Sequence, residues 1–251
     1  LDHKDNYYSI NFQAFEEELK NGVEAVVICN PHNPIGRVWT DGEMEHIVDL
    51  CVEYGVYLLS DEIHADFGMT RPYTTAGRFE KIHDRLVVYT AISKTFNMAG
   101  LGSSCMMIPN PELKQKISDS YDACWMFGPC DLAFTAMEAA YTHGDAWVDQ
   151  QLAYLEGNVE TVNTFVAEHM PGVQVTKHEG TFLMWLDMTC FGKSSRELTS
   201  ILAKEYGLAL GDGSHYGTQA EGFMRLNIGC TRDTLIKGLE QMAVMYDKYV
   251  K

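Results

Sequence analysis

Two apolar runs flank an amphipathic helix pattern near the start of the chain, and this arrangement constrains the fold most. The runs "VEAVVICN" (23–30) and "GVYLLSDE" (55–62) are typical of strands buried on both faces. Between them, Thr40 and Glu43 have the spacing of a capping box, and Gly55 ends the helix pattern. The order strand, helix, strand predicts a βαβ unit, which belongs to a mainly parallel sheet.

An apolar stripe on the predicted helix is expected to pack against this sheet. Its members are Met44, Ile47, Val48, Cys51 and Val52. A third apolar run, "RLVVYTAIS" at 85–93, predicts a further buried strand. Ligands of such sheets bind at the carboxyl ends of the strands, so the segments 30–36, 60–66 and 93–102 are candidates for a site.

The pattern changes after residue 145. A long helix pattern covers 146–172, and short strand and helix patterns then alternate up to a last amphipathic helix that starts at Thr231. We therefore expect an α/β fold in two domains. Residues 1–145 would form a mostly parallel sheet flanked by helices, and residues 146–251 a smaller α+β domain.

Charge and cysteine content restrict the partners. The 251 residues include 19 Lys and Arg against 35 Asp and Glu, a net charge of −16 that repels nucleic acids and anionic membranes and favours a small-molecule substrate. The seven cysteines, an odd number without a CxxC pair, indicate reduced thiols. With no apolar run of about 18 residues or more, this predicts a cytoplasmic protein.

Four residues with chemical potential lie at predicted strand ends or on a strand. They are Asn33 in "NPHNPIG", Asp61 in "SDEIHADF", Lys94 in "AISKTFNMAGL" and Arg225 in "GFMRLNIGC". A lysine that is partly removed from water is a nucleophile able to form a Schiff base. Taken singly, each residue also has a structural explanation, such as a turn, a hydrogen-bonded carboxylate or a surface lysine.

A metal site is the weakest interpretation of these segments. Asp61, His64 and Asp66 are possible ligands, but no second cluster of ligands accompanies them in the sequence. We therefore predict no metal.

Together, the motifs "NPHNPIGRVW", "SDEIHADF", "SKTFNMAGL" and "GFMRLNIGC" resemble pyridoxal-phosphate enzymes of the aspartate-aminotransferase fold. The resemblance runs essentially from end to end. Within the fold, His64 lies three residues after Asp61, where transaminases commonly have tyrosine. In this detail the chain resembles the branch of cystathionine β-lyases and cysteine-S-conjugate β-lyases.

The resemblance implies a role for each residue. Lys94 would hold pyridoxal 5'-phosphate as a Schiff base and remove the substrate's α-proton. Asp61 would pair with the pyridine nitrogen, and Asn33 would hydrogen-bond the phenolic oxygen with His64 nearby. Arg225 would bind the α-carboxylate of an amino-acid substrate through its planar fork. The implied products are a thiol, pyruvate and ammonia.

Two departures concern the cofactor phosphate. Many relatives carry serine where this chain has Ala91, and transaminases carry a basic residue where it has Gly102. The hydroxyls of Thr90 or Ser93 are the candidates to replace them. The chain also begins at Leu1, and we expect it to lack the N-terminal portion that supplies phosphate donors, a stacking aromatic residue and part of a homodimer interface. A fragment of this kind should bind the cofactor weakly.

Two other functions remain open from the sequence. A class I/II aminotransferase would use the same residues but requires a keto acid as second substrate. An aminotransferase-like regulatory domain would act as a sensor fused to a DNA-binding domain.

Overall fold

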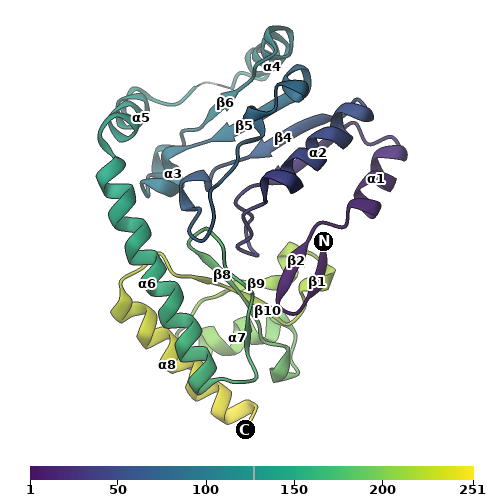
Figure 1. Cartoon of the computed structure of the whole chain (residues 1–251). Coiled ribbons are helices and arrows are strands. Elements are labelled where there is room, and N and C mark those ends of the chain that lie inside the picture. The colour runs from purple at the N-terminus through teal and green to yellow at the C-terminus, as the bar shows by residue number, and fades with distance from the viewer. Residues whose placement is uncertain (127) are drawn as a thin grey trace. The chain divides into compact units, whose positions relative to one another are not determined.

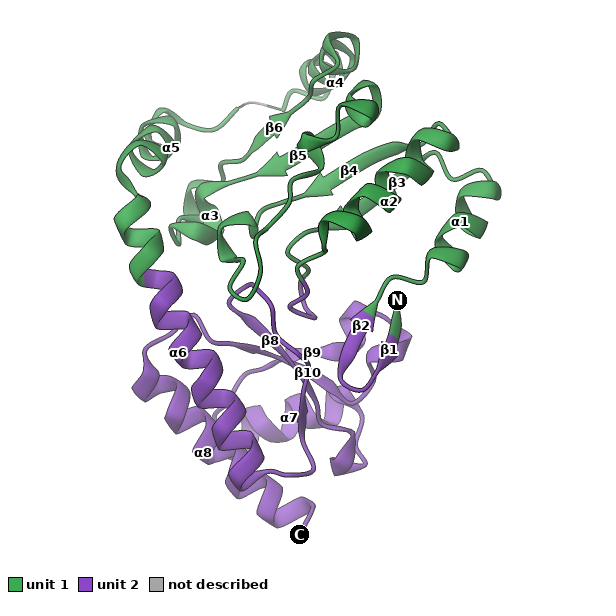
Figure 2. Ribbon diagram, viewed as in Figure 1, with its two compact units in different colours: residues 1–2, 9–32, 38–150 green, residues 3–8, 33–37, 151–251 purple. Residues whose placement is uncertain are grey.

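The computed structural model describes residues 1–126 and 128–251 (Figure 1). The chain divides into two compact units, coloured separately in Figure 2. Unit 1 consists of residues 1–2, 9–32 and 38–150, and unit 2 consists of residues 3–8, 33–37 and 151–251.

The centre of unit 1 is a sheet with the order β3-β4-β5-β6 (Figure 2). Its strands are β3 (Ala25–Cys29), β4 (Tyr57–Asp61), β5 (Leu86–Thr90) and β6 (Cys105–Met107). The first three are parallel, and β6 runs antiparallel to β5. The predicted α/β fold with a mostly parallel sheet is confirmed, and the three long strands match the three apolar runs. The expected burial of both faces is wrong for β3, because Val27 is 70% exposed.

Helices of unit 1 follow the strands along the chain. They are α1 (Phe12–Lys20), α2 (Asp41–Glu53), α3 (Ile92–Thr95), α4 (Pro111–Ala123) and α5 (Asp131–His143). Helix α2 begins with the predicted capping box, in which Thr40 Oγ1 accepts a bond from the Glu43 amide at 3.1 Å and Glu43 Oε2 accepts one from the Thr40 amide at 2.8 Å.

The predicted apolar stripe of α2 is wrong at one position. Met44, Ile47, Val48 and Cys51 are buried as expected, but Val52 is 42% exposed. Leu50, which the stripe left out, is buried instead with Leu19 of α1 and Val56. Helix α1 thus covers a flank of α2 that the sequence pattern of α2 alone does not reveal.

Unit 2 contains an antiparallel sheet with the order β7-β8-β10-β9. Its strands are β7 (Gln174–Val175), β8 (Leu183–Asp187), β9 (Gly211–Asp212) and β10 (Phe223–Asn227), and its helices include α7 (Ser195–Tyr206) and α8 (Arg232–Tyr249). The long helix α6 (Asp145–His169) contains the border between the units. A two-stranded sheet of β1 (Asp2–Lys4) and β2 (Tyr7–Ser9) precedes α1.

The contacts divide the chain differently from the boundary expected at residue 145. The border falls after Gln150, and two short N-terminal segments join unit 2. Both segments bond to residues far along the chain: the Lys177 amide donates to the Asn6 carbonyl at 2.9 Å, and the Glu179 amide to the Gly36 carbonyl at 2.8 Å. A local sequence pattern cannot show such bonds.

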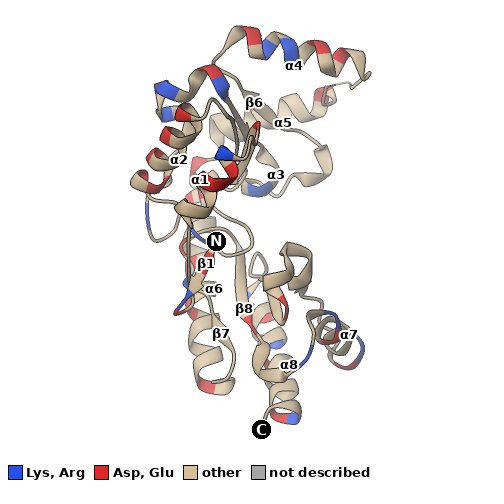
Figure 3. Cartoon of the chain, turned by 90° about the vertical axis from the view of Figure 1, so that its right-hand side faces the viewer, with Lys and Arg blue, Asp and Glu red and all other residues tan. Residues whose placement is uncertain are grey.

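Acidic residues mark α1 and α2 in Figure 3, in keeping with the net charge of −16. In residues 1–126 and 128–251, no helix combines the length and the apolar composition needed to cross a bilayer.

Candidate functional site

Asp61 and Lys94 lie at the same edge of the unit 1 sheet. Asp61 is the last residue of β4 and lies opposite Tyr89 of β5 in register. Because β4 and β5 are parallel, their carboxyl ends meet at one edge. Lys94 lies on α3, the short helix that follows β5 directly, and its side chain is partly exposed. The structure therefore brings the strand ends that carry these two residues together, as predicted.

A hydrogen bond connects the segment after β4, which contains His64, to α3, which carries Lys94. Thr95, the neighbour of Lys94, donates from Oγ1 to Asp66 Oδ2 at 2.6 Å. On the other side, the Trp147 indole donates to the Thr95 carbonyl at 3.4 Å. Two hydrogen bonds of Thr95 thus hold α3 to the segment after β4 and to α6.

Asp61 and His64 differ in burial. Asp61 is half-buried, and its Oδ1 accepts a bond from the Ile63 amide at 3.1 Å. His64 is only 2% exposed, and its ring lies 6.1 Å from that of Phe67. The buried ring of His64 thus packs in the core, whereas the Asp61 carboxylate at the end of β4 is partly open to solvent.

Three hydroxyl groups lie near Lys94 in sequence. Thr90, at the end of β5, is hydrogen-bonded to Tyr141, whose pKa is raised by burial. Ser93 is half-buried on α3. Ser103, which the sequence analysis missed, has a buried Oγ that lacks a hydrogen-bond partner among the residues that the structure describes. Such a group is rare in a folded protein, and it was not visible in any sequence pattern.

Glu62, next to Asp61, is a second residue that sequence reasoning missed. Its buried carboxylate accepts bonds from Ser60 Oγ and the Ala76 amide, both at 2.8 Å, and from the Tyr73 hydroxyl. Burial, reinforced by the charge of Glu62, raises the pKa of Tyr73. Because these three donors come from its own unit, we assign Glu62 a structural role that fixes the chain beyond β4.

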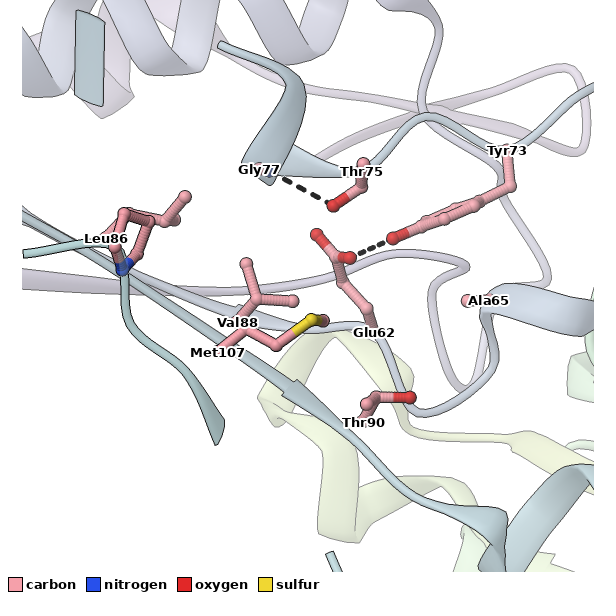
Figure 4. A pocket seen from close by; sticks show the side chains of 10 residues that line it. Glu62, Ala65, Tyr73, Thr75, Gly77, Leu86, Val88, Thr90 and Met107 are labelled. Atoms are coloured by element: carbon pink, nitrogen blue, oxygen red, sulfur yellow. Dashed lines mark hydrogen bonds between the residues drawn. The ribbon is translucent and has the colours of Figure 1, made fainter. Parts of the chain in front are cut away.

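A cavity of about 330 Å³ opens beside Glu62 (Figure 4). Its polar wall includes Glu62, Tyr73, Thr75 and Thr90, and its apolar wall includes Val88 and Met107. Figure 4 shows the bond between Tyr73 and Glu62 at its rim. Thr90 is the one predicted site residue among its lining residues, so the cavity does not unite the Asp61 and Lys94 group.

Asn33 and Arg225 form a separate pair in unit 2. Arg225 Nη1 donates to Asn33 Oδ1 at 3.0 Å, and the Arg225 guanidinium carbon lies 5.2 Å from the Tyr216 ring centre. Arg225 lies on β10 opposite Trp185 of β8 and Gly211 of β9. Gly211, in the glycine-rich segment at 207–217, thus lies beside Arg225 in the sheet.

The predicted residues thus fall into two groups. Asp61, His64, Thr90, Ser93 and Lys94 belong to unit 1, whereas Asn33 and Arg225 belong to unit 2. Within the described residues, no group of three or more His, Cys, Asp or Glu side chains is arranged to hold a metal ion.

Comparison with known proteins places these motifs in a family. The aminotransferase class I and II family matches residues 2–242. Cystathionine beta-lyase PatB of Bacillus subtilis is 38% identical over 242 residues, which cover 95% of this chain and 62% of PatB. Protein MalY of Escherichia coli is 32% identical over 223 residues, which cover 85% of this chain and 55% of MalY.

Solved structures agree with this assignment. Cystalysin from Treponema denticola, which contains a pyridoxal 5'-phosphate cofactor, has a TM-score of 0.94 at 31% identity; the match covers 100% of this chain and 64% of cystalysin. A PLP-bound putative aminotransferase from Clostridium difficile 630 also has a TM-score of 0.94, at 32% identity, with 98% and 64% covered. The chain thus spans between 55% and 64% of the length of these relatives, and it belongs to the class I and II aminotransferase family.

Proposed function

We propose that this chain is part of a pyridoxal-phosphate-dependent carbon–sulfur β-lyase that acts on cystathionine or cysteine S-conjugates. The observation that carries the proposal is the position of Lys94 on the helix after β5, at the sheet edge where Asp61 ends β4. The names of PatB and of the cystathionine beta-lyase of Corynebacterium glutamicum, which is 30% identical, support the same activity. His64 supports it as well, because it replaces the tyrosine that is common in transaminases.

The chemistry of the donor groups fits pyridoxal phosphate. Lys94 offers an amine for covalent attachment, and Asp61 offers a carboxylate for the protonated pyridine nitrogen. For the phosphate, the chain offers the hydroxyls of Thr90 and Ser93. Gly102, which stands where transaminases carry a basic residue, has open space around it and offers no charge. The chain therefore provides residues for the covalent bond and for the pyridine ring, but fewer groups for the phosphate.

Each residue would then have one task in the reaction. When bound, pyridoxal phosphate supplies an electron sink for the carbon that loses its proton. Lys94 Nζ would take that α-proton as general base. Asp61 would keep the proton on the pyridine nitrogen, because a carboxylate favours a positive partner. Loss of the thiolate from the β-carbon and hydrolysis would leave thiol, pyruvate and ammonia.

Arg225 would bind the substrate α-carboxylate. Its Nη1 donates to Asn33, so the remaining N–H groups of the guanidinium can form the two parallel bonds that a carboxylate accepts. Asn33 accepts this bond through Oδ1, which leaves its amide nitrogen as the donor toward the phenolic oxygen of the cofactor.

The nearest alternative is an aminotransferase, the activity after which the family is named. Incubation of the full-length protein with cystathionine and pyridoxal phosphate, without a keto acid, separates the two. A lyase releases pyruvate and thiol in equal amounts, and the Lys94→Ala variant releases neither. Product formation only after a keto acid is added would replace the lyase by the aminotransferase.

A homodimer and a cytoplasmic location, both expected from the sequence, belong to the same proposal. Light scattering of the full-length protein would test the first: a mass of two subunits is expected, and a monomer at working concentration would exclude it.

A further inference from the structure

A buried ion pair holds the segment 33–37 in unit 2. Arg37 Nε donates to Glu179 Oε2 at 2.8 Å, and both side chains are 0% exposed. Arg37 also donates to the Tyr8 carbonyl and lies 4.2 Å from the ring centre of Tyr7. The guanidinium is therefore fixed by charge, by hydrogen bonding and by an aromatic face.

The backbone of the same segment is fixed as well. The Gly36 carbonyl accepts bonds from the amides of Glu179 and Gly180, at 2.8 and 3.0 Å. Gly36 has φ +71°, and a Cβ at this position would lie 2.5 Å from His178 Nδ1. Only glycine permits this close approach, so the segment has one position against residues 178–180.

Asn33 begins this segment, and Asn33 is the residue that bonds Arg225. Only Pro34 and Ile35 separate it from the fixed pair Gly36 and Arg37. Because Glu179 bonds both the Arg37 side chain and the Gly36 carbonyl, its position sets the course of the chain that carries the Asn33 amide to Arg225.

Stability alone does not explain the pair. Removing two charges from water costs free energy that their attraction only partly returns, and an apolar pair of similar volume is often at least as stable. A buried pair does fix geometry, because each charge must keep its partner.

We propose that Arg37 and Glu179 are positioning residues that hold Asn33 against Arg225, so that the Arg225 guanidinium meets the substrate α-carboxylate in one orientation. This inference rests on the proposed function, since it assigns the substrate contact to Arg225. It adds a second pair of residues, remote from the reacting atoms, that determines substrate affinity.

The Glu179→Gln variant of the full-length, cofactor-loaded protein tests the proposal. It keeps the shape of the side chain and removes the charge. We expect KM to rise about 10-fold, because a misplaced Arg225 guanidinium forms a weaker hydrogen bond with the substrate carboxylate. The value of kcat should stay within about twofold. Glu205→Gln is the matched control, because it removes an exposed ion pair with Lys248 in the same unit and should change neither constant.

A double-mutant comparison separates positioning from general destabilisation. In an Asn33→Ala background, Glu179→Gln should raise KM no further, because the residue through which it acts is absent. A full additional 10-fold rise in that background would overturn the proposal. If Glu179→Gln does not fold, the paired variant Arg37→Met with Glu179→Leu, which leaves no unpaired charge, takes its place. If neither Glu179→Gln nor the paired variant folds, the ion pair is required for folding, and the proposal is overturned.

A measurement without cofactor keeps this test independent of the proposed function. In ¹⁵N spectra of the cofactor-free chain, the Arg225 side-chain signal, assigned with Arg225→Lys, should shift in Glu179→Gln and stay in place in Glu205→Gln. An Arg225 signal that is unchanged in both variants would contradict the positioning role, whether or not the protein is a lyase. A shifted signal in a protein that releases no thiol would retain the positioning and reject the lyase.

Discussion

Replacing His178 should reduce the loss of stability of this chain in mild acid. His178 is buried in unit 2, where Nε2 donates to the Thr181 carbonyl at 3.0 Å. Burial lowers the pKa of His178 from 6.5 to about 4, and the bond to Thr181 and the charge of Glu179 offset only part of this effect. The folded chain therefore keeps this ring neutral between pH 6.5 and pH 4.

The sign and size of the effect follow from proton linkage. Between those two pKa values the unfolded chain binds a proton that the folded chain does not, so stability falls as pH falls. Going from pH 7 to pH 4, the lowering of the His178 pKa from 6.5 to about 4 predicts a loss of about 3 kcal/mol in the free energy of unfolding. Hydrogen bonds from Ser194 lower the pKa of the exposed Glu197. The contribution of such carboxylates to the free energy of unfolding is therefore lost only near and below pH 4.5.

Urea unfolding followed by circular dichroism at pH 7, 5.5 and 4 measures this loss. His178→Gln keeps a donor for Thr181 and cannot be protonated, so its loss between pH 7 and pH 4 should be smaller than that of the unchanged chain by about 3 kcal/mol. His215→Gln, which removes an exposed histidine of unit 2, is the control. Equal pH dependence in the unchanged chain and in His178→Gln would refute the reasoning.

Three further outcomes are expected. Lys94→Ala should lower turnover of the full-length protein at least 10²- to 10⁴-fold in a pyruvate-release assay, because it removes the general base, and near-normal turnover would assign the chemistry to another residue. Arg225→Lys should raise KM far more than the dissociation constant of pyridoxal phosphate, because it loses the bidentate fork and keeps the charge; an equal loss of both would make Arg225 structural. Thr40→Ala removes the cap of α2 and should cost about 1 kcal/mol in urea unfolding, whereas an unchanged midpoint would mean that the capping box contributes nothing.

Features that depend on neighbours along the chain could be predicted from the sequence. The strands and the helix at 23–62 needed only hydrophobic period and cap residues, and the structure confirms that they form, although one face of β3 is exposed at Val27. Lys94 and Asp61 could be placed at one sheet edge for the same reason, because parallel strands align their carboxyl ends. Leu50 shows the limit of such patterns, since it packs against α1 on a side that the α2 pattern does not specify.

Features that depend on distant residues could not be predicted. Arg37 and Glu179 are far apart in the sequence, and neither residue type indicates burial, because single Arg and Glu side chains are usually exposed. Asn33 belongs to unit 2 for the same reason, because its segment bonds to residues far along the chain. Glu62 was overlooked because Asp61 and Glu62 are adjacent carboxylates, and only the structure shows that Glu62 is the one that accepts three hydrogen bonds.

The central claim is that Lys94 is the residue that binds pyridoxal phosphate. The most direct measurement mixes the chain with the cofactor, reduces the bound form with borohydride and locates the added mass by peptide sequencing in a mass spectrometer. We expect the modification on Lys94, at cofactor concentrations where the exposed lysines Lys20 and Lys251 remain unmodified, because α3 and Asp61 present Lys94 to the ring. Modification spread equally over these lysines, or absent from Lys94, would contradict the account.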